Sequence, residues 1–190
     1  MLMIFVGKSG CGKSTIEKHF EKMISFTTRK AREGEVNGKD YYFYDRKVIE
    51  QEIPKFQAKQ PTFIKQLSTY AGEYYGTSQE EVERIKKLDL AVAVMNLEGA
   101  KDMQNIMREN GVKTKIIWID IDEDLRIERI TGRTADTGET LEQIKLRLNE
   151  DFRDNEKEEV DYILENNGSL EEILKKINDL VEVSTRLSNL

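Results

Sequence analysis

One segment near the N-terminus constrains this chain more than any other, because it joins an apolar strand to a glycine-rich loop. The strand is Met3-Ile4-Phe5-Val6, and the loop Gly7-Lys8-Ser9-Gly10-Cys11-Gly12-Lys13-Ser14-Thr15 matches the pattern G-x-x-x-x-G-K-S. Glycines let a backbone curl so that successive N–H groups point at phosphate oxygens, and a helix N-terminus behind them favours negative charge. The segment therefore predicts a nucleoside triphosphate site.

The residues of this loop have distinct expected roles. Lys13 is expected to reach the β- and γ-phosphates, and the Ser14 hydroxyl is expected to ligate Mg²⁺. A helix is expected over Ser14 to Met23. The predicted ATP-binding residues of the loop are Gly7, Ser9, Gly10, Cys11, Gly12, Lys13, Ser14 and Thr15.

Composition limits the class of protein. The chain has 190 residues, 35% of them charged, a mean hydropathy of -0.63 and a net charge of -6. No apolar run approaches the roughly 20 residues of a membrane span, and no signal peptide is recognisable. One cysteine and one histidine argue against a disulfide and against a zinc site, and the negative charge disfavours a nucleic-acid polymer as partner. We expect a single cytoplasmic domain without a membrane partner.

Strands and helices alternate along most of the chain, which predicts an α/β fold with a parallel sheet flanked by helices. A change of pattern from Ile24 to Thr77 predicts a small, mostly β insertion with an aromatic strand at residues 41–44. Capping boxes are expected at Ser78 with Glu81 and at Ser169 with Glu172. The remaining expectations are strands at 2–6, 90–95, 115–120 and 162–164, helices at 98–109, 122–130 and 141–158, a loop at 131–140, and an apolar stripe of Leu170, Ile173, Leu174 and Ile177 on the last helix.

A second segment, from Ser25 to Tyr41, carries the groups that bind a phosphate without a glycine loop. Arg29 and Arg32 lie three residues apart, hydroxyl residues precede them, and Tyr41 follows two glycine turns. Forked guanidinium groups with O–H donors are well suited to a phosphate. The segment predicts a second phosphate site, alongside the plainer reading of a solvated basic turn.

These segments resemble the guanylate kinase family. The family's S-x-T-T-R-x-x-R-x-G-E-x-x-G-x-D-Y pattern is matched from Ser25 to Tyr41, and its G-x-Y-Y-G-[ST] pattern is matched from Gly72 to Thr77. The resemblance extends to an arginine-bearing lid around 129–133 and to the last strand. It implies one domain over 1–190, with a P-loop core at 1–28, 78–130 and 146–190, a nucleoside monophosphate-binding insertion at 29–77 and a lid at 131–145.

The resemblance also implies an activity and a set of site residues. The activity would be transfer of the γ-phosphoryl group from ATP, with Mg²⁺, to a nucleoside monophosphate, by default GMP or dGMP. The implied catalytic residues are Lys13, Arg129, Arg133 and Arg147, and Asn166 would lie on the adenine side. The implied monophosphate-binding residues are Ser25, Arg29, Arg32, Glu35, Tyr41, Gln66, Tyr75, Thr77 and Asn96.

The chain departs from the family pattern where the base would be read. Gln66 and Asn96 stand where the family usually has a glutamate and an aspartate, and Val94 replaces another aspartate. Guanine offers two adjacent donors that a carboxylate accepts, whereas an amide offers one acceptor and one donor. A deoxypyrimidine monophosphate such as dTMP, dUMP or a modified form is therefore an open alternative. A nearby carboxylate, Glu73 or Glu98, is the counter-reading, and Val94 predicts weaker Mg²⁺ affinity.

A different class of function also remains open, since guanylate kinase-like domains can serve as non-catalytic binding modules. Such modules commonly lose the loop lysine, which this chain retains as Lys13. The sequence leaves open whether the chain forms a homodimer.

Overall fold

The computed structural model describes residues 1–70, 72–132 and 154–186. The chain divides into two compact units: the first comprises residues 1–3, 21–93 and 98–114, and the second comprises residues 4–20, 94–97 and 115–190. The predicted insertion at 29–77 falls within the first unit, and the glycine loop falls within the second. Most of the predicted lid, from residue 133 onward, lies outside the described residues.

One four-stranded sheet has the strand order β6-β1-β7-β8. Strand β7 pairs in parallel with β8, so that Ile117 lies opposite Tyr162 and Asp120 lies opposite Glu165. All five residues of β1 are buried, as continuous apolar strands are in a sheet covered on both faces. The bounds are β1 Leu2–Val6, β6 Ala91–Val94, β7 Thr114–Asp120 and β8 Tyr162–Glu165, which confirms the four predicted strands.

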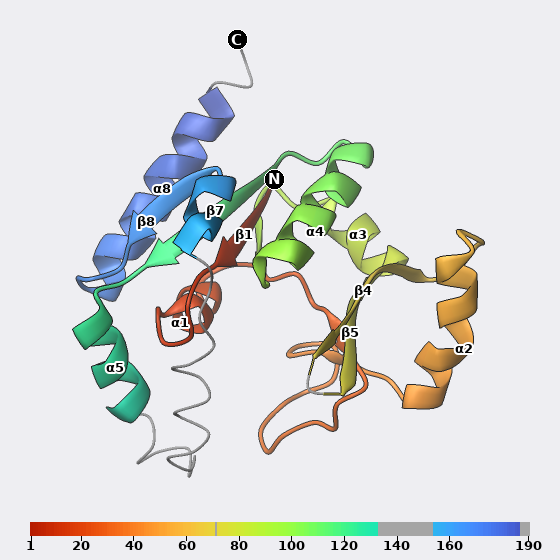
Figure 1. Cartoon of the computed structure of the whole chain (residues 1–190). Coiled ribbons are helices and arrows are strands. Elements are labelled where there is room, and N and C mark those ends of the chain that lie inside the picture. The colour runs from red at the N-terminus through yellow and green to blue at the C-terminus, as the bar shows by residue number, and fades with distance from the viewer. Residues whose placement is uncertain (71, 133–153, 187–190) are drawn as a thin grey trace. The chain divides into compact units, whose positions relative to one another are not determined.

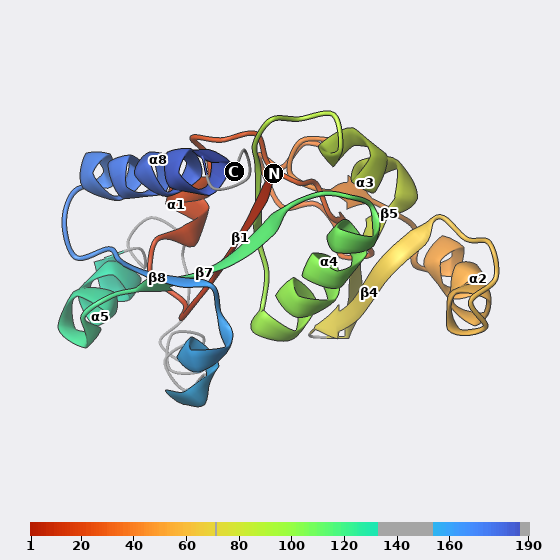
Figure 2. The same cartoon turned by 90° about the horizontal axis from the view of Figure 1, so that it is seen from above.

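Helices of the second unit cover both faces of β7 and β8. Figure 2 shows α1 and α8 on one side of these two strands and the short 3₁₀ helix η1 on the other. The predicted capping box of α8 is confirmed, since Glu172 N donates to Ser169 Oγ at 3.2 Å and Ser169 N donates to Glu172 Oε2 at 3.1 Å. The bounds are α1 Lys13–Glu17, α5 Glu123–Gly132, η1 Asp154–Glu159 and α8 Leu170–Arg186.

Three details of this unit differ from the prediction. The helix after the loop ends at Glu17 rather than Met23, because Lys22 and Met23 pair instead with Val92, where Met23 N donates to the Val92 carbonyl at 2.7 Å. The last described residues of the α-helix predicted over 141–158 belong instead to the 3₁₀ helix η1. On α8, Ile173 and Ile177 are buried but Leu170 is exposed. Helical side chains lean toward the N-terminus, so the side chain of the first residue extends past the helix end.

The first unit contains a second four-stranded sheet, with the order β3-β2-β5-β4. Strands β4 and β5 form an antiparallel hairpin, visible in Figure 1 beside helix α2. Phe26, Ile49 and Ile64 form the buried centre of a cluster between this sheet and α2, surrounded by aromatic side chains. The bounds are β2 Phe26–Thr27, β3 Tyr42–Phe43, β4 Ile64–Tyr70, β5 Glu73–Ser78, α2 Arg46–Gln57, α3 Gln79–Ile85 and α4 Leu97–Glu109.

Helix α2 differs from the prediction, because the segment from Ile24 to Thr77 was expected to be mostly β. Its N-cap is Asp45, whose side chain accepts from Lys47 N at 2.8 Å. Ile49, Ile53 and Phe56 all pack in the aromatic cluster, which is the spacing of one helix face. That spacing indicates a helix in the sequence, whereas Pro54, which lies in the last turn, is unfavourable inside a helix and argues against one.

Helix α3 begins at the predicted cap, but only half of the expected capping box forms. Ser78 Oγ accepts from Glu81 N at 3.2 Å. The Glu81 carboxylate, instead of turning back to Ser78, accepts from Ile24 N at 2.7 Å and from Arg84. Glu81 is buried, so its charge is satisfied by the backbone N–H of Ile24 and by Arg84 one turn along the same helix, rather than by the backbone of Ser78.

Candidate functional site

The glycine loop of the second unit has the conformation that phosphate binding requires. Gly7, Gly10 and Gly12 have φ angles of 137°, 87° and 96°, in the region that favours glycine. Gly12 is also the N-cap of α1, so the loop ends at a helix N-terminus. A side chain at Gly12 would meet Asn166 Nδ2 at 2.5 Å, so both conformation and space demand glycine there. The loop can hold an anion against backbone N–H groups.

Carbonyl oxygens of the loop are held by donors from several elements. Lys13 Nζ donates to the Gly7 carbonyl at 2.6 Å and to the Lys8 carbonyl at 2.9 Å. Asn166, at the end of β8, donates from Nδ2 to the Cys11 carbonyl at 2.8 Å and is 6% exposed. The sequence suggested an adenine-side role for Asn166, and the structure places its amide directly on the loop.

Two predicted residues at the start of α1 are exposed, namely Ser14 and Thr15. Among the described residues, no group of three or more His, Cys, Asp or Glu could hold a metal ion. A hydroxyl is nevertheless a suitable ligand for Mg²⁺ that is held mainly by substrate phosphates and water. Ser14 thus fits the metal's ordinary chemistry in such sites, whereas a cage made only of protein ligands is absent from this part of the chain.

Arg129 lies on α5, on the side of the helix that faces the loop. A side chain built at Gly12 would come within 3.6 Å of Arg129 Nη1. The structure therefore brings Arg129 together with the loop, and its catalytic role stays a prediction. The other two predicted arginines, Arg133 and Arg147, lie outside the described residues.

The second predicted phosphate site centres on Arg29 in the first unit. Arg29 Nη2 donates to Glu35 Oε1 at 2.8 Å and Nη1 donates to Glu35 Oε2 at 3.0 Å, while Arg32 N donates to the same Oε2 at 2.7 Å. The hydrogen bond from Arg29 lowers the pKa of Glu35, and the bond to Glu35 raises the pKa of Arg29. Glu35 therefore stays ionised and fixes the guanidinium of Arg29 and the backbone of Arg32.

Aromatic side chains surround Arg29. Its guanidinium carbon lies 5.4 Å from the centre of the Tyr41 ring and 5.9 Å from that of Phe43. The Tyr41 and Tyr75 rings lie 6.1 Å apart, edge to face. Sheet register explains the grouping, because Thr27 on β2 pairs with both Phe43 and Tyr75, and paired residues share a face. Ser25, just before β2, is partly buried, and Arg32 is exposed.

The predicted base-reading residues of the hairpin, Gln66 and Thr77, lie opposite each other on β4 and β5. Both are buried, and Thr77 Oγ1 has no hydrogen-bond partner in the described structure. Gly76 next to Thr77 is essential to this packing, since a side chain there would overlap Phe26 and the Gln66 carbonyl. A buried hydroxyl without a partner is costly, and a ligand with a complementary polar group would satisfy it.

Glu73, one of the carboxylates considered as a substitute base reader, is engaged elsewhere. Its Oε2 accepts a short hydrogen bond from Thr28 Oγ1 and lies 3.6 Å from Arg46 Nη1. Thr28 Oγ1 in turn accepts from Tyr74 N at 3.0 Å. Glu73 therefore fastens the residue before Arg29 to the hairpin, a role that sequence reasoning missed. Asn96 and Val94 belong to the second unit, and Glu98 is exposed on α4.

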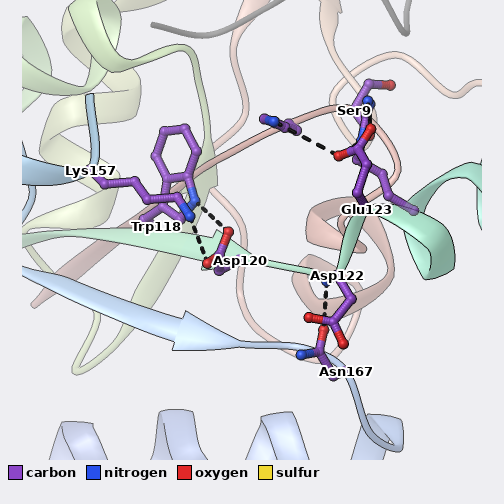
Figure 3. Close-up of polar contacts among 9 residues, drawn as sticks. Ser9, Trp118, Asp120, Asp122, Glu123, Lys157 and Asn167 are labelled. Carbon is purple, nitrogen blue, oxygen red and sulfur yellow. Dashed lines mark hydrogen bonds and ion pairs between the residues drawn. The ribbon is translucent and has the colours of Figure 1, made fainter. Parts of the chain in front are cut away.

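A further cluster stands at the carboxyl end of β7, shown in Figure 3. Asp120 Oδ2 accepts from Lys157 Nζ at 2.7 Å, and Asp120 Oδ1 accepts from Trp118 Nε1 at 3.3 Å. Burial acts to raise the pKa of Asp120, but the bonds from Lys157 and Trp118 outweigh it, so the pKa is lowered. The sequence pattern gave no sign of this pair, because its partners are 37 residues apart.

Comparisons with known proteins agree on one family. The profile of the guanylate kinase family matches residues 1–184. A guanylate kinase of Lactococcus lactis subsp. lactis is 33% identical over 164 residues, covering 80% of this chain and 74% of that protein. One of Listeria monocytogenes serotype 4b is 35% identical over 154 residues, covering 75% of this chain and 70% of that protein.

A solved structure also resembles this chain over most of its length. The crystal structure of guanylate kinase from Anaplasma phagocytophilum has a TM-score of 0.63 to this chain at 24% identity, covering 97% of this chain and 85% of that one. At that identity the likeness concerns the fold alone. Within residues 1–70, 72–132 and 154–186, no helix is both long and apolar enough to cross a membrane.

Proposed function

The chain belongs to the guanylate kinase family of ATP-dependent nucleoside monophosphate kinases, and we propose that its acceptor is GMP or dGMP. The observation that carries this proposal is the fixed guanidinium of Arg29. It is held by Glu35 beside Tyr41 and Tyr75, in the segment that carries the family's monophosphate signature. A forked cation with neighbouring phenols is suited to a terminal phosphate.

The donor half of the reaction rests on the glycine loop. We assign ATP to Gly7, Ser9, Gly10, Cys11, Gly12, Lys13, Ser14 and Thr15, with Lys13 and Arg129 as catalytic residues that neutralise charge on the transferred group. The Ser14 hydroxyl would hold Mg²⁺ together with the phosphates of ATP, and the ion would supply further charge neutralisation. Arg133 and Arg147 complete the proposed set.

A second acceptor is favoured by one observation at the hairpin. Gln66 is an amide buried opposite the unpartnered Thr77 hydroxyl, and Glu73 is occupied by Thr28 and Arg46. The hairpin thus offers an amide where adjacent guanine donors need a carboxylate. A base that alternates donor and acceptor, as in dTMP or dUMP, suits an amide better, and Asn96 would extend the same preference.

One assay tests both acceptors. ADP release from ATP would be measured with each common ribo- and deoxyribonucleoside monophosphate, and acceptors ranked by kcat/KM. The first proposal expects GMP or dGMP to rank first. The second expects dTMP or dUMP to rank first, and expects Gln66→Glu with Asn96→Asp to move the ranking toward the guanine nucleotides. Absence of acceptor-dependent ADP release with every nucleotide would contradict both and favour a binding module.

A further inference from the structure

Arg126 is a buried cation beside the glycine loop that neither the motif nor the family signatures include. Its side chain is 4% exposed, although it lies on α5 next to solvent-exposed neighbours. Nε donates to Glu123 Oε2 at 2.9 Å and Nη2 donates to Glu123 Oε1 at 2.5 Å. The remaining terminal nitrogen, Nη1, donates to the Ser9 carbonyl at 3.3 Å. Arg126 therefore connects the first turn of α5 to the loop.

The other contacts of α5 with the loop lie on the same face of the helix. A side chain at Gly10 would meet Ile130 Cγ1 at 2.6 Å and Arg126 Cγ at 3.3 Å, and one at Gly12 would approach Arg129. Residues 126, 129 and 130 have the spacing of a single helix face. Figure 3 draws Ser9 and Glu123, the two residues to which the Arg126 guanidinium donates. The orientation of Arg129 toward the loop thus depends on how α5 is fixed there.

The bond from Arg126 to Ser9 is one of several hydrogen bonds that fix the carbonyl groups of the glycine loop. Lys13 holds the carbonyls of Gly7 and Lys8, and Asn166 holds that of Cys11. Arg126 holds the Ser9 carbonyl between them. A carbonyl fixed outward leaves neighbouring N–H groups directed toward a bound anion. Burial of a cation is unfavourable unless the cation is paired with an anion. Glu123 is that partner for Arg126.

We propose that Arg126 is a positioning residue, which fixes the Ser9 carbonyl and the first turn of α5 so that the loop and Arg129 are both set for the triphosphate. This inference rests on the proposed role of the loop as the ATP site. Arginine suits this role because one edge of its planar fork bonds the Glu123 carboxylate at two points while Nη1 reaches Ser9, whereas a lysine has one nitrogen and cannot present that fork.

Arg84 provides a matched control within the same chain. It also pairs with a glutamate three residues earlier, Glu81, and its Nη2 also donates to a backbone carbonyl, that of Lys22 at 2.5 Å. This second pair lies in the first unit and contacts no residue of the glycine loop among the bonds described. A loss of the loop contact can therefore be separated from a loss of an ordinary helix ion pair.

The test compares Arg126→Leu, Arg126→Lys and Arg84→Leu by calorimetric titration with ATP and Mg²⁺ and by steady-state kinetics. We expect Arg126→Leu to weaken ATP binding by about tenfold, less than a full charge-assisted hydrogen bond because Arg126 acts on ATP only through the loop, with the monophosphate KM unchanged. Arg126→Lys should give an intermediate loss. Arg84→Leu should lower the melting temperature and leave both constants unchanged.

Two results would overturn the inference. One is wild-type ATP affinity in Arg126→Leu or, if that variant does not fold, in Arg126→Lys. The other is an equal loss of affinity for ATP and for the monophosphate. The variant Lys13→Met tells whether the proposed role of Arg126 is wrong or the proposed ATP site itself is wrong. If the loop binds ATP but Arg126 does not position it, Lys13→Met lowers kcat by about 10²-fold or more while the Arg126 variants bind ATP with wild-type affinity.

Discussion

Glu35→Gln tests whether the Arg29 cluster is the acceptor site. The Glu35 carboxylate accepts three hydrogen bonds, two from the Arg29 guanidinium at 2.8 and 3.0 Å and one from Arg32 N at 2.7 Å. The neutral amide keeps one acceptor oxygen and turns an N–H₂ group toward donors. The variant therefore loses at least one charge-assisted bond and leaves Arg29 without its counter-charge.

The size of the expected change in the monophosphate KM follows from the burial of the Arg29–Glu35 pair. The Arg29 and Glu35 side chains are 18% and 20% exposed, so solvent screens the pair only in part. One hydrogen bond to a charged group contributes about 2 kcal/mol, which corresponds to about a 30-fold change in an equilibrium constant. We expect the KM for the monophosphate to rise by about that factor, because Arg29 must be reordered before it can bind phosphate. The KM for ATP should not change.

Glu50→Gln is the control, because Glu50 forms an equally short bond with Arg46, at 2.8 Å, but both side chains are nearly half exposed. Initial rates of ADP formation with one substrate varied and the other saturating give both constants. The reasoning fails if Glu35→Gln leaves the monophosphate KM unchanged, or lowers it. A lower KM would mean that Glu35 competes with the substrate for Arg29 rather than positioning it.

Three further predictions concern the second unit. Lys13→Met should lower kcat by about 10²-fold or more, since it removes charge stabilisation of the transferred group, and single-turnover rates would check this. Asn166→Ala should weaken ATP binding by about tenfold, measured by titration, because the Cys11 carbonyl loses its buried donor. The pKa of Asp120 is lower in the folded chain than in the unfolded chain. The pair with Lys157 therefore stabilises the fold fully above the unfolded-state pKa, and this stabilisation is lost as the pH falls through the folded-state pKa. Denaturant unfolding should therefore find Asp120→Asn less stable than wild type by about 0.5–1 kcal/mol at pH 7, with the difference shrinking as the pH falls through the folded-state pKa of Asp120, whereas a constant difference would contradict the assignment.

Local pattern determined a large part of this fold. The strands at 2–6 and 162–165, the α8 capping box and the glycine loop follow from short stretches of sequence, because strand burial, helix caps and positive φ angles each depend on neighbouring residues. The two phosphate segments were recognisable for the same reason. Helix α2 is also encoded locally, in the spacing of Ile49, Ile53 and Phe56, although the glycine turns and aromatic pairs around it favour strands.

Tertiary structure decided the features whose partners are distant in sequence. Helix α1 ends early because Lys22 and Met23 pair with Val92, and the Glu81 carboxylate accepts from Ile24 N, 57 residues away, instead of completing its capping box. Asn166 and Arg126 reach the loop across 155 and 117 residues. A sequence pattern reports what each residue can donate or accept, but burial requires every donor and acceptor to find a partner. Which partner is available depends on segments that only the folded chain brings together.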